Sequence, residues 1–514
     1  PGPRAQEIRE RPPRGRPPTP EWTRLVTSPT FLAVIVSVAA FALTAYVACF
    51  VLERIPHVQD SVAYLFQAKV FASGRLWAPL PALPKFFDHE FVVMHEGRWF
   101  AKYPPGHPAL LAIGVLVGAP WLINPAASAL SLFVVYLIGR RLYGAGTGLL
   151  AATLGLVSPF FVFMSGSHMA HPTGLLFVLL FVWLLTCRRG WVAAALAGMA
   201  LGMAFLIRPW TAGAIAAPFA LSALVDLARH PRLGLPKYVA VVGGLAPFVA
   251  VWLAYNAALA GHPLKNTMEL WWEFDRVGFG PGHGPFGHTP LDGLWNTSRN
   301  MGELLTHLFG WPASLTLVFA MVPFVAGRAR QADALLLACF LCLVGAYALW
   351  WADGIMFGPR FYYEGLGFLL LLTARGVVEA ADVARSAAAR LGRRQTWLGL
   401  AVVGSLLSLL ILHNLALYLP GQWQLYHGYN YVNRGPLQTV EGAGVRNALV
   451  FAHVGDPHEW WNYGMVFSAN SPLLDSDVVY ARDLGDAENR KLMALYPERS
   501  YYRLKGTSLE LITP

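Results

Sequence analysis

The sequence predicts an all-α protein that crosses a membrane many times and carries a small α/β domain at its C-terminal end. Of its 514 residues, 55% are hydrophobic and only 13% are charged, too few to cover a soluble globule of this size. Apolar runs such as 31–52 can cross the hydrocarbon core, which takes about 20 residues. Near residue 420 this composition disappears. We expect a cytoplasmic tail at 1–30, a transmembrane domain at 31–419 and an extracytoplasmic domain at 420–514.

The basic residues indicate which side of the membrane each loop occupies. Lys and Arg concentrate in cytoplasmic loops, and here they recur in clusters after every second apolar run. The segment 1–30 is rich in arginine and proline, so we expect a disordered cytoplasmic tail. The formal charge of +10 therefore marks one membrane face and gives no support for a nucleic-acid partner. The further clusters are Arg140-Arg141, Arg188-Arg189, 229–237, 328–330 and 385–394.

About eleven transmembrane helices place every one of these clusters on the cytoplasmic side. The run 108–121 is short and contains Gly114, Gly118 and Pro120, which predicts an interfacial or re-entrant segment. Counting it as a full span would move Arg140-Arg141 and the later clusters outside. The expected spans are 31–52, 125–139, 146–164, 172–187, 191–207, 211–228, 238–259, 303–326, 332–350, 365–382 and 396–418.

The C-terminal domain is expected to alternate strands and a helix. About ninety residues is within the size that folds alone. The four cysteines, Cys49, Cys187, Cys339 and Cys342, lie in or beside apolar segments, so no disulfide framework is expected. The predicted strands are 448–453, 478–481, 500–504 and 509–512, with a helix at 486–495.

Three short motifs follow one another as in a known class of enzymes. They are Lys102-Tyr103-Pro104-Pro105-Gly106-His107-Pro108, Gly139-Arg140-Arg141-Leu142-Tyr143-Gly144 and Ser158-Pro159-Phe160. With this topology, residues 30–380 resemble the GT-C glycosyltransferases that use polyprenyl-phosphate sugars, which include protein O-mannosyltransferases and the aminoarabinose transferase of lipid A. The resemblance implies a GT-C-like membrane domain with an external active site.

The resemblance also implies an acidic catalytic base in the first external loop, 53–107, and Asp60 is the residue that matches. The chain departs from the family pattern at two places. Ser61 stands where the family often has a second acidic residue. His168 and His171 stand where an acidic residue of the second external loop is often found.

The external residues suit sugar transfer from a lipid phosphate. Because phosphate is a good leaving group, the reaction needs one base and a set of cations, unlike glycoside hydrolysis with its two carboxylates. Asp60 is the candidate base, and Lys102, Arg208 and Arg360 are the candidate ligands of the donor phosphate. We expect a single displacement at the anomeric carbon with inversion. No cofactor is expected to be required, although a divalent metal is compatible with this chemistry.

Each of these residues also has a structural interpretation. Asp60 could cap the helix that follows it, and Lys102 could be a headgroup anchor. Arg360 could pair with Glu364 along a helix, and Arg208 could extend toward the membrane surface. The sequence leaves these alternatives open.

A second set of residues is expected to contact the sugar or the acceptor. His168 and His171 could relay protons or bind a metal, or simply form hydrogen bonds at the start of a span. The loop 260–302 could be a lid or a disordered loop. Trp271, Trp272, Trp350 and Trp351 are interpreted as an interfacial belt in preference to sugar-stacking platforms. The candidate substrate-binding residues are Tyr64, Tyr103, His168, His171, Tyr362, Tyr363 and Glu364.

The sequence thus predicts a hexosyl- or pentosyltransferase of the plasma membrane that acts on the extracytoplasmic face. The expected partners are a polyprenyl-phosphate sugar donor, the bilayer, and a lipid, glycan or protein acceptor. A transporter or flippase of lipid-linked sugars is an alternative, but it would need charged or broken helices near the midplane. A glycan ligase or polymerase would share the external site. Nucleotide sugars fit less well, because no glycine-rich phosphate-binding motif is present.

Overall fold

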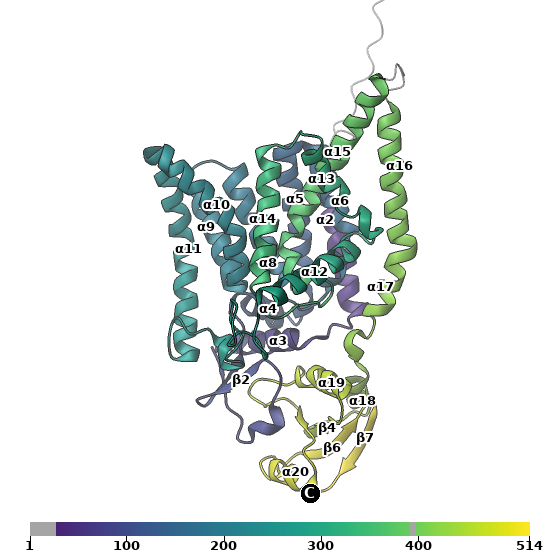
Figure 1. The fold of residues 1–514 in the computed structure, drawn as a ribbon. Helices are drawn as coiled ribbons and strands as arrows, with labels where there is room; N and C mark the ends of the chain where they lie inside the picture. Colours follow the sequence, from purple (N-terminus) through teal and green to yellow (C-terminus); the bar gives the residue numbers. More distant parts are fainter. Residues whose placement is uncertain (1–26, 391–396) are drawn as a thin grey trace, which may run out of the picture.

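A computed structural model describes residues 27–390 and 397–514 of the chain. It shows a bundle of long helices with a small sheet-containing unit at one end (Figure 1). In Figure 1 the yellow C-terminal unit lies beyond α3 (Gln59–Ala72), at the end of the bundle opposite the start of α16 (Trp397–His413). Most of the tail expected at 1–30 lies outside the described residues.

The helices of the bundle follow most of the predicted spans. Among the described residues, six helical segments are long and apolar enough to cross a membrane, or seven if α6 and α7, bent by 61°, form one span. The predicted count of eleven is therefore confirmed only in part. The bundle contains α2 (Pro29–Tyr46) with the turn η1 (Val47–Val51), α5 (Ile123–Tyr143), α6 (Ala145–Leu156), α7 (Pro159–Gly166), α8 (His171–Cys187), α9 (Trp191–Ile207), α10 (Pro209–Arg229), α11 (Pro231–Ala260), α14 (Gln331–Ala348), α15 (Leu366–Arg390) and α16, which η7 (Asn414–Tyr418) and α17 (Leu419–Tyr426) continue.

The segment predicted to be interfacial forms α4 (Gly106–Leu116). Its 11 residues are too few to cross the hydrocarbon core at about 1.5 Å per residue. It packs against α3, and η3 (Pro120–Leu122) then leads into α5. In Figure 1 α3 and α4 lie at the same end of the bundle, so the chain stays there between α2 and α5.

The prediction of one span at 303–326 is wrong. An amphipathic helix, α12 (Pro290–His307), begins with a capping box between Thr289 and Asp292 and exposes Leu291 and Trp295 on one face. The chain then breaks at Gly310, whose φ of +60° a helix interior does not allow. After η5 (Ala313–Leu315), the short helix α13 (Val318–Val325) completes the segment. The apolar run 303–326 therefore contains the end of α12, a turn and the short helix α13, although its length would suit a single span.

The loop 53–107 is structured around α3. After this helix come β1 (Ala78–Pro79), η2 (Pro84–Phe87), β2 (Val92–His95) and β3 (Arg98–Ala101). The strands form an antiparallel sheet in the order β1-β3-β2, in which Met94 pairs with Trp99. Trp99 is buried against Phe66 of α3, with ring centroids 4.6 Å apart. This sheet fixes the path of the chain from α3 to α4.

The C-terminal unit contains all the secondary structure predicted for it, and three further helical segments. Its four-stranded sheet has the order β5-β4-β6-β7, with β4 parallel to β5 and β6, and β7 antiparallel to β6. All five residues of β4 are buried, so this strand is covered on both faces. The elements are η8 (Tyr429–Tyr431), α18 (Gly435–Gly442), β4 (Ala448–Ala452), α19 (Pro457–Phe467), β5 (Val478–Arg482), α20 (Asp486–Met493), β6 (Ser500–Lys505) and β7 (Ser508–Ile512).

The C-terminal unit is attached to α3 by buried polar contacts. Lys69 near the end of α3 donates to the carbonyl oxygens of Ser468 and Asn470, at 2.6 and 3.0 Å. These carbonyls follow the C-terminus of α19, where a cation is favoured. Tyr463 of α19 donates to the carbonyl of Phe86 at 3.0 Å. The unit therefore helps to hold the helix that carries Asp60.

Glycines allow α9 and α11 to pack closely. A Cβ at Gly198 would lie 2.0 Å from the carbonyl oxygen of Val241, and one at Gly244 would lie 2.1 Å from that of Ala195. Small residues at such contacts let membrane helices approach until their backbones touch.

We predict that Gly198→Val lowers the stability of the bundle by about 1–3 kcal/mol, because the added side chain forces the two backbones apart. Gly213→Val on α10 is the matched control, since a Cβ there meets no atom within 4 Å. Thermal unfolding in one detergent compares the two variants. Equal unfolding temperatures would contradict the predicted packing.

Candidate active site

A cavity of about 370 Å³ lies at the end of the bundle nearest the C-terminal unit. Its walls come from α3, the loop after β3, the junction of α9 and α10, the loop 266–277, and the segment 347–361. Six of the predicted site residues line it. They are Asp60, Tyr64, Lys102, Tyr103, Arg208 and Arg360.

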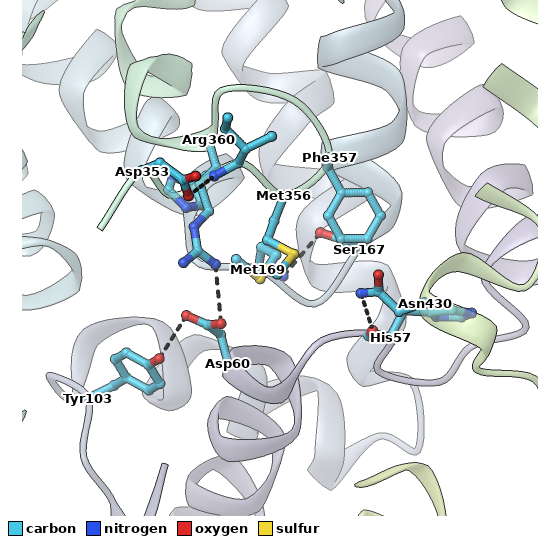
Figure 2. Close-up of polar contacts among 12 residues, drawn as sticks. His57, Asp60, Tyr103, Ser167, Met169, Asp353, Met356, Phe357, Arg360 and Asn430 are labelled. Atoms are coloured by element: carbon cyan, nitrogen blue, oxygen red, sulfur yellow. Dashed lines mark hydrogen bonds and ion pairs between the residues drawn. The ribbon is translucent and has the colours of Figure 1, made fainter. Parts of the chain in front are cut away.

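Asp60 lies in the first turn of α3, and its carboxylate contacts two other residues of the cavity lining (Figure 2). Tyr103 donates its hydroxyl to Oδ1 at 2.7 Å, and Arg360 donates from Nη1 to Oδ2 at 3.1 Å. The N-cap residue of α3 is Val58, and no side chain caps this helix end. The carboxylate of Asp60 is therefore directed at the cavity residues and does not act as a helix cap.

The surroundings of Asp60 keep its carboxylate ionised. Burial alone would raise its pKa, but the charge of Arg360, the hydrogen bond from Tyr103 and the charge of Lys102 outweigh burial and hold the pKa below the ordinary value. The side chains of Asp60 and Arg360 are 13% and 14% exposed, so the pair borders the cavity and is not sealed off.

A sharp backbone turn precedes Arg360, whose side chain contacts Asp60. Phe357 and Gly358 both have positive φ, +56° and +98°, which turns the chain sharply before η6 (Arg360–Gly365). A non-glycine residue in that conformation carries a backbone cost that functional sites often bear. Arg360 Nε is buried and has no hydrogen-bond partner among the described residues. One donor of this guanidinium is thus left for a ligand.

Arg208 ends α9 and carries a second ion pair. Its Nε lies 3.1 Å from Glu364 Oε1, and Nη2 donates to the Tyr347 hydroxyl at 2.5 Å. Glu364 also lies 3.2 Å from His171 Nδ1. Glu364 therefore pairs with Arg208 and His171, in place of the i,i+4 pair with Arg360 that was one reading of the sequence.

Lys102 is enclosed by aromatic rings and a carboxylate. Its Nζ lies 2.8 Å from Asp275 Oδ2, with the two side chains 4% and 2% exposed. The same ammonium lies 4.0 Å from the ring centroid of Phe91 and 4.7 Å from that of Trp272. Trp351 Nε1 donates to the other oxygen of Asp275 at 3.0 Å. Lys102 is therefore buried at the site, which differs from the exposed position of a headgroup anchor.

The remaining predicted residues lie behind the cavity. His171 and Glu364 form a layer beneath Arg208. His168 is buried, and its carbonyl oxygen lies 3.0 Å from His107 Nε2. The Tyr363 hydroxyl lies 2.8 Å from Ser165 Oγ, and Tyr362 packs edge-on against Phe340. None of these five belongs to the cavity lining.

Several lining residues were not identified from the sequence. Asp275 lies in the loop 260–302, and nothing in its local sequence distinguishes it from the other charged residues there. Trp272, Trp350 and Trp351 were read as an interfacial belt, yet all three line the cavity. Paired tryptophans beside apolar runs are ambiguous, because a membrane interface and a cavity at that depth select the same residues.

No group of three or more His, Cys, Asp or Glu residues suited to a metal ion occurs within 27–390 and 397–514.

We predict that Asp275→Ala destabilises the protein by about 3–5 kcal/mol, because it leaves the Lys102 ammonium buried without a counter-ion. The double variant Lys102→Met with Asp275→Leu should recover most of this loss, since it removes both charges. Denaturation of the single and double variants in the same detergent measures the difference. A double variant no more stable than Asp275→Ala would show that the ion pair is not the cause.

No protein-family description and no curated protein matches this sequence. Solved structures do match its fold. The structure of ArnT from Cupriavidus metallidurans bound to undecaprenyl phosphate superposes with a TM-score of 0.51 and 13% identity, covering 94% of this chain and 93% of that one. The structure of the same ArnT in the apo state superposes with a TM-score of 0.51 and 14% sequence identity, and the match covers 93% of each chain.

The archaeal oligosaccharyltransferase AglB from Archaeoglobus fulgidus, in complex with an inhibitory peptide and a dolichol-phosphate, gives a TM-score of 0.45 at 14% identity, over 87% of this chain and 64% of that one. The ArnT match spans nearly both chains, including the bundle and the C-terminal unit. The GT-C fold expected from the sequence resemblance is therefore confirmed, and this chain shares the fold of ArnT.

Proposed function

We propose that the protein is an integral membrane glycosyltransferase that moves a sugar from a polyprenyl-phosphate donor to an acceptor hydroxyl on the extracytoplasmic face. The observation that carries the proposal is the position of Asp60. An ionised carboxylate, held by Arg360 and Tyr103, borders a cavity whose lining includes three cations and one further carboxylate. The fold shared with ArnT, whose structure holds undecaprenyl phosphate, supports a lipid phosphate as the donor group.

The donor phosphate would bind among Arg360, Arg208 and Lys102. Each of these cations already has a carboxylate partner, respectively Asp60, Glu364 and Asp275. The cations are thus kept in a partly dehydrated site without an excess of charge, and an incoming phosphate competes with the carboxylates for them. The unpartnered Nε–H of Arg360 gives this guanidinium a free donor for a phosphate oxygen.

This competition would activate the base. When Arg360 forms an ion pair with the phosphate, its interaction with Asp60 weakens. That interaction is the one that most lowers the pKa of Asp60. Its carboxylate becomes more basic at the moment the donor is present. Asp60 would then accept the proton of the acceptor hydroxyl while the hydroxyl oxygen bonds to the anomeric carbon. The bond from that carbon to the phosphate oxygen breaks with its electron pair, polyprenyl phosphate leaves, and the configuration inverts.

The aromatic residues would hold the sugar and the first part of the prenyl chain. Tyr347 and Phe361 stack with ring centroids 4.4 Å apart, and Trp272 and Trp351 lie edge to face at 5.9 Å. A cavity lined by aromatic and other apolar side chains with a few charged groups suits a ligand that combines a sugar with a hydrocarbon chain. The loop 260–302 supplies Trp272 and Asp275 to the lining of the cavity.

The distribution of charge supports an extracytoplasmic site in the plasma membrane. In Figure 1 the far ends of α10 and α15, which carry basic clusters, lie opposite α3 and the C-terminal unit. If basic loops face the cytoplasm, the cavity and residues 420–514 face outward.

A transfer assay tests the proposal. Purified protein is supplied with radiolabelled polyprenyl-phosphate sugars and a membrane extract as acceptor. We predict that Asp60→Asn lowers kcat by about 10²–10⁴, the usual contribution of a general base, with donor binding retained. Glu96→Gln, on the exposed turn between β2 and β3, is the control and should transfer normally.

Equal rates for wild type and Asp60→Asn would remove Asp60 from the mechanism. Movement of the labelled lipid across the membrane without its consumption would favour a flippase. Products lengthened by whole glycan blocks would favour a ligase or polymerase.

The pH profile tests the activation of Asp60. Because the folded pKa is lowered, free Asp60 stays ionised as pH falls, down to values below about 3.9, the ordinary value for Asp. The kcat/KM for the donor reports the free enzyme and kcat reports the donor complex. We predict that the acid limb of kcat lies at higher pH than that of kcat/KM. In Arg360→Gln the two limbs should coincide, and coincident limbs in the wild type would contradict the account.

A further inference from the structure

The C-terminal unit has a strand order that creates a crevice at one edge of its sheet. From β4 the chain passes through α19 to β5 on one side, then through α20 to β6 on the other side of β4. The hairpin that follows β6 leads farther away, to β7. The segments after β4 and β6 therefore diverge. In open parallel sheets, ligands bind where such segments diverge, outside the carboxyl ends of the strands.

A cavity of about 120 Å³ lies at this point. His453 follows β4, Thr507 follows β6, and Glu459 and Asn462 project from α19. Glu459 accepts the amide hydrogen of Gly455 at 2.5 Å and lies 3.7 Å from His453 Nε2. These contacts fix the carboxylate and the imidazole at the edge of the sheet.

Asn462, which lines this cavity, has an unused hydrogen-bonding atom. Its Nδ2 donates to the carbonyls of Tyr431 and His458, at 3.0 and 3.2 Å, which orients the amide. Its Oδ1 is buried and has no partner among the described residues. A buried acceptor of this kind carries a desolvation cost unless a ligand donates to it.

The polar groups at the crevice favour an uncharged ligand. The N-terminus of α19, which would otherwise attract an anion, is already occupied by the N-cap side chain of Asp456 and by Glu459. The groups that line the crevice are the Asn462 amide, the His453 imidazole, the Thr507 hydroxyl and the Glu459 carboxylate, a set that both donates and accepts. Such a set matches the hydroxyl groups of a sugar, and the small volume admits one ring.

The residue that orients Asn462 through its carbonyl oxygen, Tyr431, is exposed. Tyr431 is 67% exposed, and its ring lies 3.9 Å from that of His458, between centroids. Asn430 and Tyr431 have φ of +56° and +62°, a conformation that costs energy in non-glycine residues. The chain therefore bears a backbone cost at Tyr431, whose carbonyl oxygen orients the Asn462 amide.

We propose that this crevice binds one uncharged, hydroxyl-rich residue of a glycan, and that it holds the acceptor during transfer. The second half of the proposal rests on the proposed glycosyltransferase function. Tyr463, which also lines the crevice, bonds to Phe86 in the loop after α3, and α19 packs against α3 itself. The crevice is therefore linked through α19 to the helix that carries Asp60.

Binding of the full-length protein, purified in lipid nanodiscs, to an array of neutral and charged oligosaccharides tests the proposal. We expect neutral oligosaccharides to bind. Thr507→Trp, which fills the crevice from an exposed position, should weaken binding about tenfold or more, the equivalent of one or two hydrogen bonds. His453→Gln, which keeps the size of the side chain, should also weaken it. Ala487→Trp on the exposed face of α20 should bind like the wild type.

Three results would overturn the proposal: no neutral oligosaccharide binds, Thr507→Trp binds as well as Ala487→Trp, or only charged oligosaccharides bind. Asp60→Asn separates this proposal from the proposed reaction, because it should abolish transfer and leave glycan binding intact. If the reaction is wrongly assigned, wild type will bind glycans without transferring sugar. If the crevice is wrongly assigned, wild type and Thr507→Trp will transfer at equal rates.

Discussion

The ion pair between Asp60 and Arg360 joins two parts of the chain that are 300 residues apart. It brings the first turn of α3, outside the bundle, against the turn that leads into α15. Tyr103 completes the coordination of the carboxylate, and Tyr103 itself precedes Pro104, which restricts it to extended backbone conformations. A carboxylate and a guanidinium at the rim of a cavity form a pair that a ligand can separate.

Two structural units support that pair from opposite sides. The bundle places Arg360 through the turn at Phe357 and Gly358 and holds Arg208 against Glu364 beneath it. The C-terminal unit holds α3 through Lys69, whose ammonium donates hydrogen bonds to the carbonyl oxygens of Ser468 and Asn470, just after α19. Burial lowers the pKa of Lys69 to about 8, so this cation is retained at a cost that its two carbonyl partners only partly offset. The C-terminal unit thus takes part in positioning the base, whatever acceptor it contacts.

The sequence predicted those features that depend on local pattern. Hydrophobic runs and basic clusters located most of the bundle helices, and short strand-like runs located the four strands of the C-terminal unit. The sequence identified Asp60 and Arg360 as separate candidate site residues, but it did not predict that they contact each other. Pairings such as Lys102 with Asp275 and Arg208 with Glu364 join distant segments, and nothing in local sequence encodes them. The prediction of one span at 303–326 was wrong for a different reason. Its composition suited a span, but Gly310 introduces a turn, and a hydropathy pattern does not reveal a single turn.

The central claim is that a lipid phosphate takes Arg360 away from Asp60 and so makes the carboxylate an effective base. An experimental structure of the protein with bound polyprenyl phosphate tests this most directly. The account predicts a phosphate oxygen within hydrogen-bonding distance of Arg360, and a longer separation between Arg360 and Asp60 than the 3.1 Å of the ligand-free pair. A phosphate bound elsewhere, or one bound while the ion pair stays intact, would contradict it.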